Sequence, residues 1–167
     1  MAVPQPKGLD SEQVIDLLAA AEALIRAEQL TEAAEQYRAL LLEPALDEVP
    51  VARTEVYANY GALLLHEARL DPVGKLAEHR LDLAIDMLGR AQLGYRMGEG
   101  AGSSVTTDTN LALAYFQRHI ATGQHADIMS AHLALDGAEL AAGRGDQPML
   151  DWIRSIRQML LAKLDRR

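Results

Sequence analysis

Apolar residues recur every three or four positions along most of the chain, which is the spacing of one face of an α-helix. The first such stripe predicts a helix over about 11–28, and its apolar members are Val14, Leu17, Leu18, Ala21, Leu24 and Ile25. Asp10 precedes this stripe, so its carboxylate can accept hydrogen bonds from the free amides of the first turn. Gln13 stands three residues later and can bond back to the Asp10 amide, which predicts a capping box.

The same periodicity predicts six further helices and no strand. The second helix follows Thr31, a candidate N-cap, and the third covers about 51–69. Asp71 and Pro72 are a capping residue and a proline at the first helical position, so the fourth helix should start there and run to about residue 96. The fifth helix ends near residues 122–123, the sixth is closed by Gly143 and Gly145, and the seventh starts at Asp146. The sequence therefore predicts an all-α protein.

Breaks in the pattern predict the domain organisation. Residues 1–9 hold two prolines and a glycine, and we predict a disordered lead there. Pro44 and Pro50 bracket a link in which a helix is interrupted. Residues 98–104 read Gly-Glu-Gly-Ala-Gly-Ser-Ser, which predicts a flexible loop. We expect one helical domain over 10–167, with packing units 10–97 and 105–167 on either side of that loop.

Helices joined by short links form antiparallel hairpins, and hairpins in series are typical of helical-repeat proteins. In the first hairpin, small and large residues occupy the positions where paired helices cross: Leu17, Ala20, Ala21, Leu24, Ala33, Tyr37 and Leu40. This stretch resembles a tetratricopeptide repeat. A second hairpin is similar at Tyr57, Tyr60, Gly61, Leu64, Ala84, Leu88 and Ala91, after an insertion of about eleven residues, and a third, more degenerate one includes Ala112, Tyr115, Phe116, Gly123, Ile128 and Leu135.

The resemblance implies a short right-handed solenoid of three stacked hairpins over about 11–142, closed by a C-terminal capping helix over 146–167. The chain departs from the family at Glu28, where the family commonly has glycine between the two helices. An irregular helical bundle is the alternative architecture.

Composition and charge narrow the function. The chain has 167 residues, of which 28 are alanine and 27 leucine, and these residues favour helices. Its net charge of −8 argues against nucleic-acid binding, which needs a basic face. No apolar run approaches the length of a bilayer span, so we expect no membrane partner. With no cysteine and no apolar leader, we expect a cytoplasmic protein.

The resemblance implies that the first helix of each hairpin lines a concave groove that holds a peptide or helix of a partner protein. The expected groove residues are Leu18, Glu22, Ile25, Arg26, Glu55, Asn59, Ala62, Leu65, His66, Asn110, Leu113 and Gln117. The amides of Asn59, Asn110 and Gln117 could hydrogen-bond a peptide backbone. Arg26 is the one groove cation, so an apolar or basic peptide fits better than a carboxylate tail. The alternative for the leucines and isoleucines is that they belong to the core.

No catalytic constellation is evident, and we expect a non-enzymatic protein without a cofactor. The five histidines (His66, His79, His119, His125 and His132) lack the tight spacing of a zinc hydrolase, so no metal site is expected. The glycines of 98–104 follow a helix and precede no lysine, which argues against a phosphate-binding loop.

A competing hypothesis is a helical ligand-sensing domain or self-associating bundle with a pocket near Tyr95, Tyr115 and His119. The charge is uneven, because residues 1–50 carry ten acids and three bases whereas residues 147–167 carry two acids and five bases. Such a distribution favours a basic partner or head-to-tail association into a homodimer, although solvated helix faces would explain the same charges.

Overall fold

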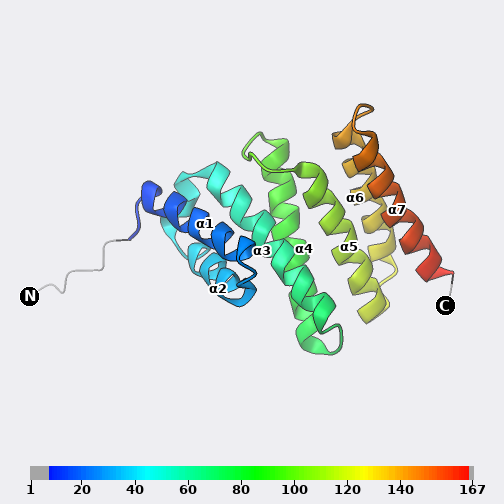
Figure 1. The fold of residues 1–167 in the computed structure, drawn as a ribbon. Coiled ribbons are helices and arrows are strands. Elements are labelled where there is room, and N and C mark those ends of the chain that lie inside the picture. The colour runs from blue at the N-terminus through cyan, green and yellow to red at the C-terminus, as the bar shows by residue number, and fades with distance from the viewer. Residues whose placement is uncertain (1–7, 166–167) are drawn as a thin grey trace, which may run out of the picture.

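The computed structural model describes residues 8–165, and this part of the chain is helical without a strand (Figure 1). The α-helices are α1 (Ser11–Arg26), α2 (Leu30–Leu40), α3 (Pro50–Leu70), α4 (Lys75–Arg96), α5 (Ser104–Thr122), α6 (Ala126–Ala142) and α7 (Gln147–Leu164). A short 3-10 helix, η1 (Pro44–Glu48), links α2 to α3. The predicted all-α class is confirmed. The predicted lead at 1–9 lies outside the described residues except for Gly8 and Leu9.

Several helix ends follow from local chemistry. The Asp10 carboxylate accepts from the Gln13 amide at 2.9 Å, and the Gln13 side chain accepts from the Asp10 amide at 3.0 Å, which confirms the capping box. Asp146 caps α7 by accepting from the Met149 amide at 3.1 Å. Gly123 ends α5 with a φ of 75°, a conformation that glycine adopts without strain.

Two predicted helix starts are wrong. The fourth helix begins at Lys75 after Gly74, which has a φ of 91°, and not at Pro72. Asp71 is used to end α3, so the chain needs the next three residues to reverse direction before α4 can start. The second helix begins at Leu30 with Gln29 as its N-cap, so Thr31 is already helical.

The link between α1 and α2 is tight, and one residue in it is strained. Glu28 has a φ of 59°, in the left-handed region, and it is the position where the sequence departs from the glycine of tetratricopeptide repeats. The Gln29 amide donates to the Leu24 carbonyl at 2.9 Å, a bond that closes a helix only when the intervening residue is left-handed.

Each helix packs chiefly on its neighbours in sequence, from α1 on α2 to α6 on α7. Figure 1 shows them side by side in chain order, with α1 and α7 at opposite ends. The buried apolar residues form one cluster that runs from Val14 in α1 to Leu160 in α7, across both sides of the loop at 98–104. The helices α3 and α4 approach closely at glycines: a Cβ on Gly61 would lie 2.7 Å from Leu88 Cγ, and one on Gly94 would overlap Thr54.

Candidate functional site

Two of the expected groove anchors belong to the core. Leu18 is 8% exposed and Leu65 is 3% exposed, and both pack within the continuous apolar cluster. The physical reason is that α1, which carries Leu18, packs on α2, η1 and α3, while α3, which carries Leu65, contacts α1, α2, α4 and α5. Both leucines therefore lie where the core alternative places them, and little of either side chain is left for a partner.

Four polar members of the expected groove, Glu22, Arg26, Glu55 and Asn59, act on the phenol of Tyr37 on α2. The Tyr37 side chain is fully buried, and its hydroxyl has no hydrogen-bond partner within residues 8–165. Burial, followed by the negative charge of Glu22, raises the pKa of Tyr37 to about 12, while Asn59 and Arg26 act in the opposite direction and Glu55 adds to the rise. Asn59 lies beside the hydroxyl without reaching hydrogen-bond geometry.

Glu55 has a structural task that the sequence did not suggest. Its Oε1 atom accepts from the backbone amides of Ala101 at 2.9 Å and Gly102 at 2.7 Å, and its Oε2 atom accepts from the Tyr95 hydroxyl at 3.1 Å. Burial, together with the Glu55 charge, raises the pKa of Tyr95. The glycine-rich loop, which was predicted to be flexible, is therefore held on α3.

The remaining groove candidates stay on partly exposed helix surface. Ile25, Ala62, Asn110, Leu113 and Gln117 are half-buried, whereas Arg26 and His66 are exposed. The two pockets described next include none of the twelve expected groove residues.

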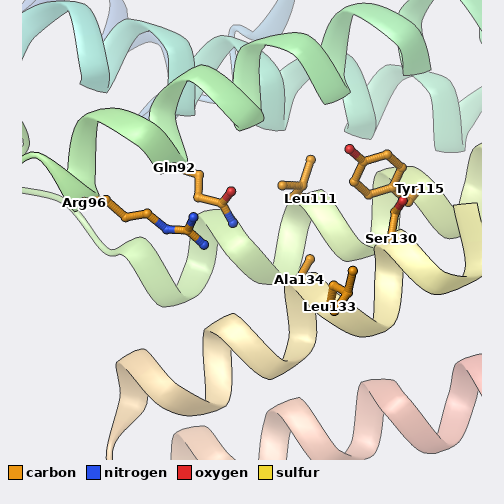
Figure 2. A pocket seen from close by; sticks show the side chains of 7 residues that line it. All are labelled: Gln92, Arg96, Leu111, Tyr115, Ser130, Leu133 and Ala134. Carbon is orange, nitrogen blue, oxygen red and sulfur yellow. The ribbon is translucent and has the colours of Figure 1, made fainter.

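Two adjoining pockets lie between α4 and α6 with α5 beneath them, and we call them together the α4–α6 trough. The first has a volume of about 200 Å³ and is lined by Gln92, Arg96, Leu111, Tyr115, Ser130, Leu133 and Ala134 (Figure 2). The second has a volume of about 240 Å³ and is lined by Gln92, Tyr95, Arg96, Ser104, Asp108, Gly137, Leu140 and Ala141. Gln92 and Arg96 belong to both, and Figure 2 shows them side by side at one end of the first pocket.

Asp108 is the chemically unusual residue of the trough, because it is a carboxylate that is only 4% exposed. The Gln92 Nε2 atom donates to its Oδ1 atom at 2.5 Å. Burial raises the pKa of Asp108, and the Gln92 hydrogen bond and the charge of Arg96 partly offset that rise. On α6, Gly137 faces the other oxygen, since a Cβ added there would lie 3.1 Å from Oδ2.

The competing hypothesis, a helical domain with a pocket near Tyr95, Tyr115 and His119, identified two of the residues that line the trough. Tyr95 and Tyr115 line the trough, as a pocket near them required. His119 does not: it is 4% exposed, and its Nδ1 atom lies 3.0 Å from the Gln124 carbonyl oxygen beside the rings of Phe116 and His125.

Sequence reasoning missed Gln92, Arg96 and Asp108. A signal for Asp108 was present, because it lies three residues before Leu111 and seven before Tyr115, on the same face of α5. An acidic residue in the apolar stripe of a helix is unusual. Gln92 and Arg96 carried no such signal, since exposed polar residues on a long helix are ordinary.

The described part of the chain holds no group of three or more histidine, aspartate or glutamate side chains placed to bind a metal ion. None of the helices within residues 8–165 has both the length and the apolar character that crossing a membrane requires. Comparison with protein-family models, with curated proteins and with solved structures finds no match for this chain.

Proposed function

We propose that this protein is a non-enzymatic interaction module, built as a short tetratricopeptide-like stack, that holds a peptide or helix of a partner protein. The packing of each helix on its sequence neighbours supports the stack, as do the small residues where α3 crosses α4. The absence of cysteine from the sequence is consistent with a cytoplasmic location, which belongs to the same proposal.

The observation that carries the proposal is the α4–α6 trough with its apolar rim. Leu133 is 63% exposed and Leu140 is 85% exposed, and both line the pockets. Apolar side chains in such a position gain free energy when a partner removes them from water. The expected anchors Leu18 and Leu65 offer no such gain because they are already buried. The binding site proposed here is therefore the trough and not the groove of the sequence hypothesis.

A displayed library of random peptides, selected on the purified protein, tests this proposal. Peptides that bind should lose affinity for a Leu133→Glu/Leu140→Glu variant and keep it for Leu42→Glu. Leu42 is the matched control because it is 80% exposed and lies in the link after α2. Peptides that bind both variants as they bind the unmodified protein would move the site away from the trough.

A small-molecule sensor is the second candidate function, and the buried carboxylate of Asp108 is the observation that favours it. A panel of metabolites screened by thermal shift distinguishes the two, since a sensor is stabilised by a compound that fills about 200–240 Å³. Association of two copies through the exposed apolar face of α6 is a third outcome, which the mass measured by light scattering detects.

A further inference from the structure

We propose that Asp108 is the receptor for a cationic group, an ammonium or guanidinium, carried by the ligand of the α4–α6 trough. This inference rests on the trough being a binding site, as the proposed function states. The cation has two possible sources, a lysine or arginine side chain of a partner and a free amine, and the chemistry recognised is the same.

The first argument is the comparison with Asp127, another nearly buried carboxylate of the same helical layers. Asp127 is 3% exposed, and Arg118 donates to both of its oxygens, from Nε at 2.9 Å and from Nη2 at 2.7 Å. Asp108 is 4% exposed and forms no ion pair within residues 8–165. The fold supplies an internal cation to one buried aspartate and leaves the other without one.

The second argument is the space beside Asp108. Its Oδ1 atom is used by Gln92, whereas Oδ2 faces α6 at a residue that has no side chain, Gly137. Asp108 also lines the 240 Å³ pocket, so a ligand atom can reach the carboxylate from the trough. A desolvated anion with one neutral donor is costly, and a cation that binds it recovers part of that cost.

The third argument is the state of Arg96, the one charged residue whose field acts on Asp108. Arg96 lines both pockets, is exposed and makes no ion pair within the described residues. Arg96 is therefore an exposed cation that lines the same pocket as the buried carboxylate and is not bonded to it. We therefore expect an incoming cation to displace Arg96, and removing Arg96 should strengthen the binding.

The experiment titrates n-butylammonium into the nitrogen-15-labelled protein at neutral pH and follows the Gln92 side-chain amide and the Gly137 backbone amide by NMR. Butanol is the neutral probe of the same shape and should leave both signals in place. A capped Leu-Lys-Leu peptide, with Leu-norleucine-Leu as its neutral counterpart, separates a side chain of a partner from a free amine.

Three variants and one control variant decide the outcome. Asp108→Asn keeps the size and the Gln92 contact and should weaken binding of the ammonium about tenfold or more. Arg96→Gln should tighten it, whereas Arg26→Gln, a change of the same kind on α1, should leave it unaltered. Gly137→Ala places a methyl group near Oδ2 and should weaken binding without removing the charge.

The pH dependence adds an independent measurement. The charged and titratable groups that face Asp108 are Arg96 and Tyr95 of α4, while α6 presents only Gly137, Leu140 and Ala141. Tyr95 is neutral near pH 7, as an ordinary phenol is, and burial raises its pKa further, so the binding curve reports the Asp108 carboxylate. Ammonium binding should disappear as the pH falls through the Asp108 pKa.

Binding by Asp108→Asn equal to that of the unmodified protein would overturn the inference, as would the absence of any shift with both cationic probes. Weaker binding of n-butylammonium to Arg96→Gln would also overturn it, because Arg96 would then support the site instead of competing with the incoming cation. Failure of the peptide-binding proposal looks different: n-butylammonium still shifts Gln92 in an Asp108-dependent way, but no selected peptide depends on Leu133 and Leu140.

Discussion

Asp127 and Asp108 are buried to the same degree, yet their surroundings differ. Asp127 lies in the first turn of α6 and is held by Arg118 of α5, which also reaches Asp82 of α4 at 2.8 Å. This arginine ties three helices together, and the Asp127 hydrogen bonds raise its pKa. Asp108 has an amide partner and an open pocket instead. A buried charge that is satisfied internally stabilises the fold, whereas one that is not marks a place where a ligand can act.

The largest expected effect on stability comes from removing the arginine that pairs with Asp127. Arg118→Leu leaves Asp127 buried without its cation, and we expect a loss of about 3–5 kcal/mol in the free energy of unfolding. Urea unfolding followed by far-UV circular dichroism measures it. Arg154→Leu, which removes an exposed arginine paired with Asp151, should change stability by less than about 1 kcal/mol. Equal losses in the two variants would show that the Asp127 pair is not special.

The second effect is the difference in stability between a substitution in the core and one on the rim of the trough. Leu65→Ala should lower the free energy of unfolding by about 2–5 kcal/mol because it opens a cavity among α3 and its neighbours. Leu133→Ala, on the rim of the trough, should stay within about 0.5 kcal/mol of the unmodified protein. The same urea titration checks both variants, and a stable Leu65→Ala would return that residue to the list of groove anchors.

The third effect changes stability away from both aspartates. Glu28→Gly relieves the left-handed strain between α1 and α2 and should raise the free energy of unfolding by up to about 1 kcal/mol. Glu28→Ala keeps the strain and should give no such gain. Thermal unfolding by calorimetry measures the difference. Ammonium binding at Asp108 should be the same in both, which shows that binding does not follow global stability.

The smallest expected effect is the pH dependence of stability that comes from Asp108. Because burial raises the Asp108 pKa in the folded protein, folding takes up a proton there, and stability falls as the pH rises between the unfolded and the folded pKa. Asp108→Asn removes this dependence, so it should be modestly more stable than the unmodified protein at pH 7 and lose that advantage in acid. Melting temperatures across a pH series measure it. A less stable Asp108→Asn at pH 7 would mean that the carboxylate is already satisfied in the free protein.

The features that could be predicted from the sequence are those that depend on residues close together in the chain. The caps at Asp10 and Asp146 follow from side chains that bond three residues away, and the all-α class follows from apolar periodicity. The start of α4 was missed because Asp71 ends α3 and Gly74, with a φ of 91°, precedes α4, so Pro72 lies in the turn between the two helices.

The candidate site was predicted less well, because its parts are distant in the chain. Gln92 and Asp108 are 16 residues apart, and Gly137 comes from a third helix. Tyr95 and Tyr115 were identified as neighbours of a pocket, but the carboxylate between them was not. The resemblance to tetratricopeptide repeats placed the groove on the face of α5 that carries Asn110, Leu113 and Gln117, and not on the face that carries Asp108. Asp108, an acidic residue on the apolar face of α5, was the better guide to the site. The free-energy cost of burying its carboxylate is evident from the sequence pattern without knowledge of how the helices pack.

Glu55 gives the glycine-rich loop a role in the rates of folding. Its carboxylate bonds amides that lie 46 and 47 residues further along the chain, so these bonds close a long loop and should form after α3 and α4 have paired. Interactions that form after the transition state slow unfolding without speeding folding. In stopped-flow experiments Glu55→Ala should therefore raise the unfolding rate and leave the refolding rate unchanged. One side chain would then determine how long the native fold persists before it unfolds.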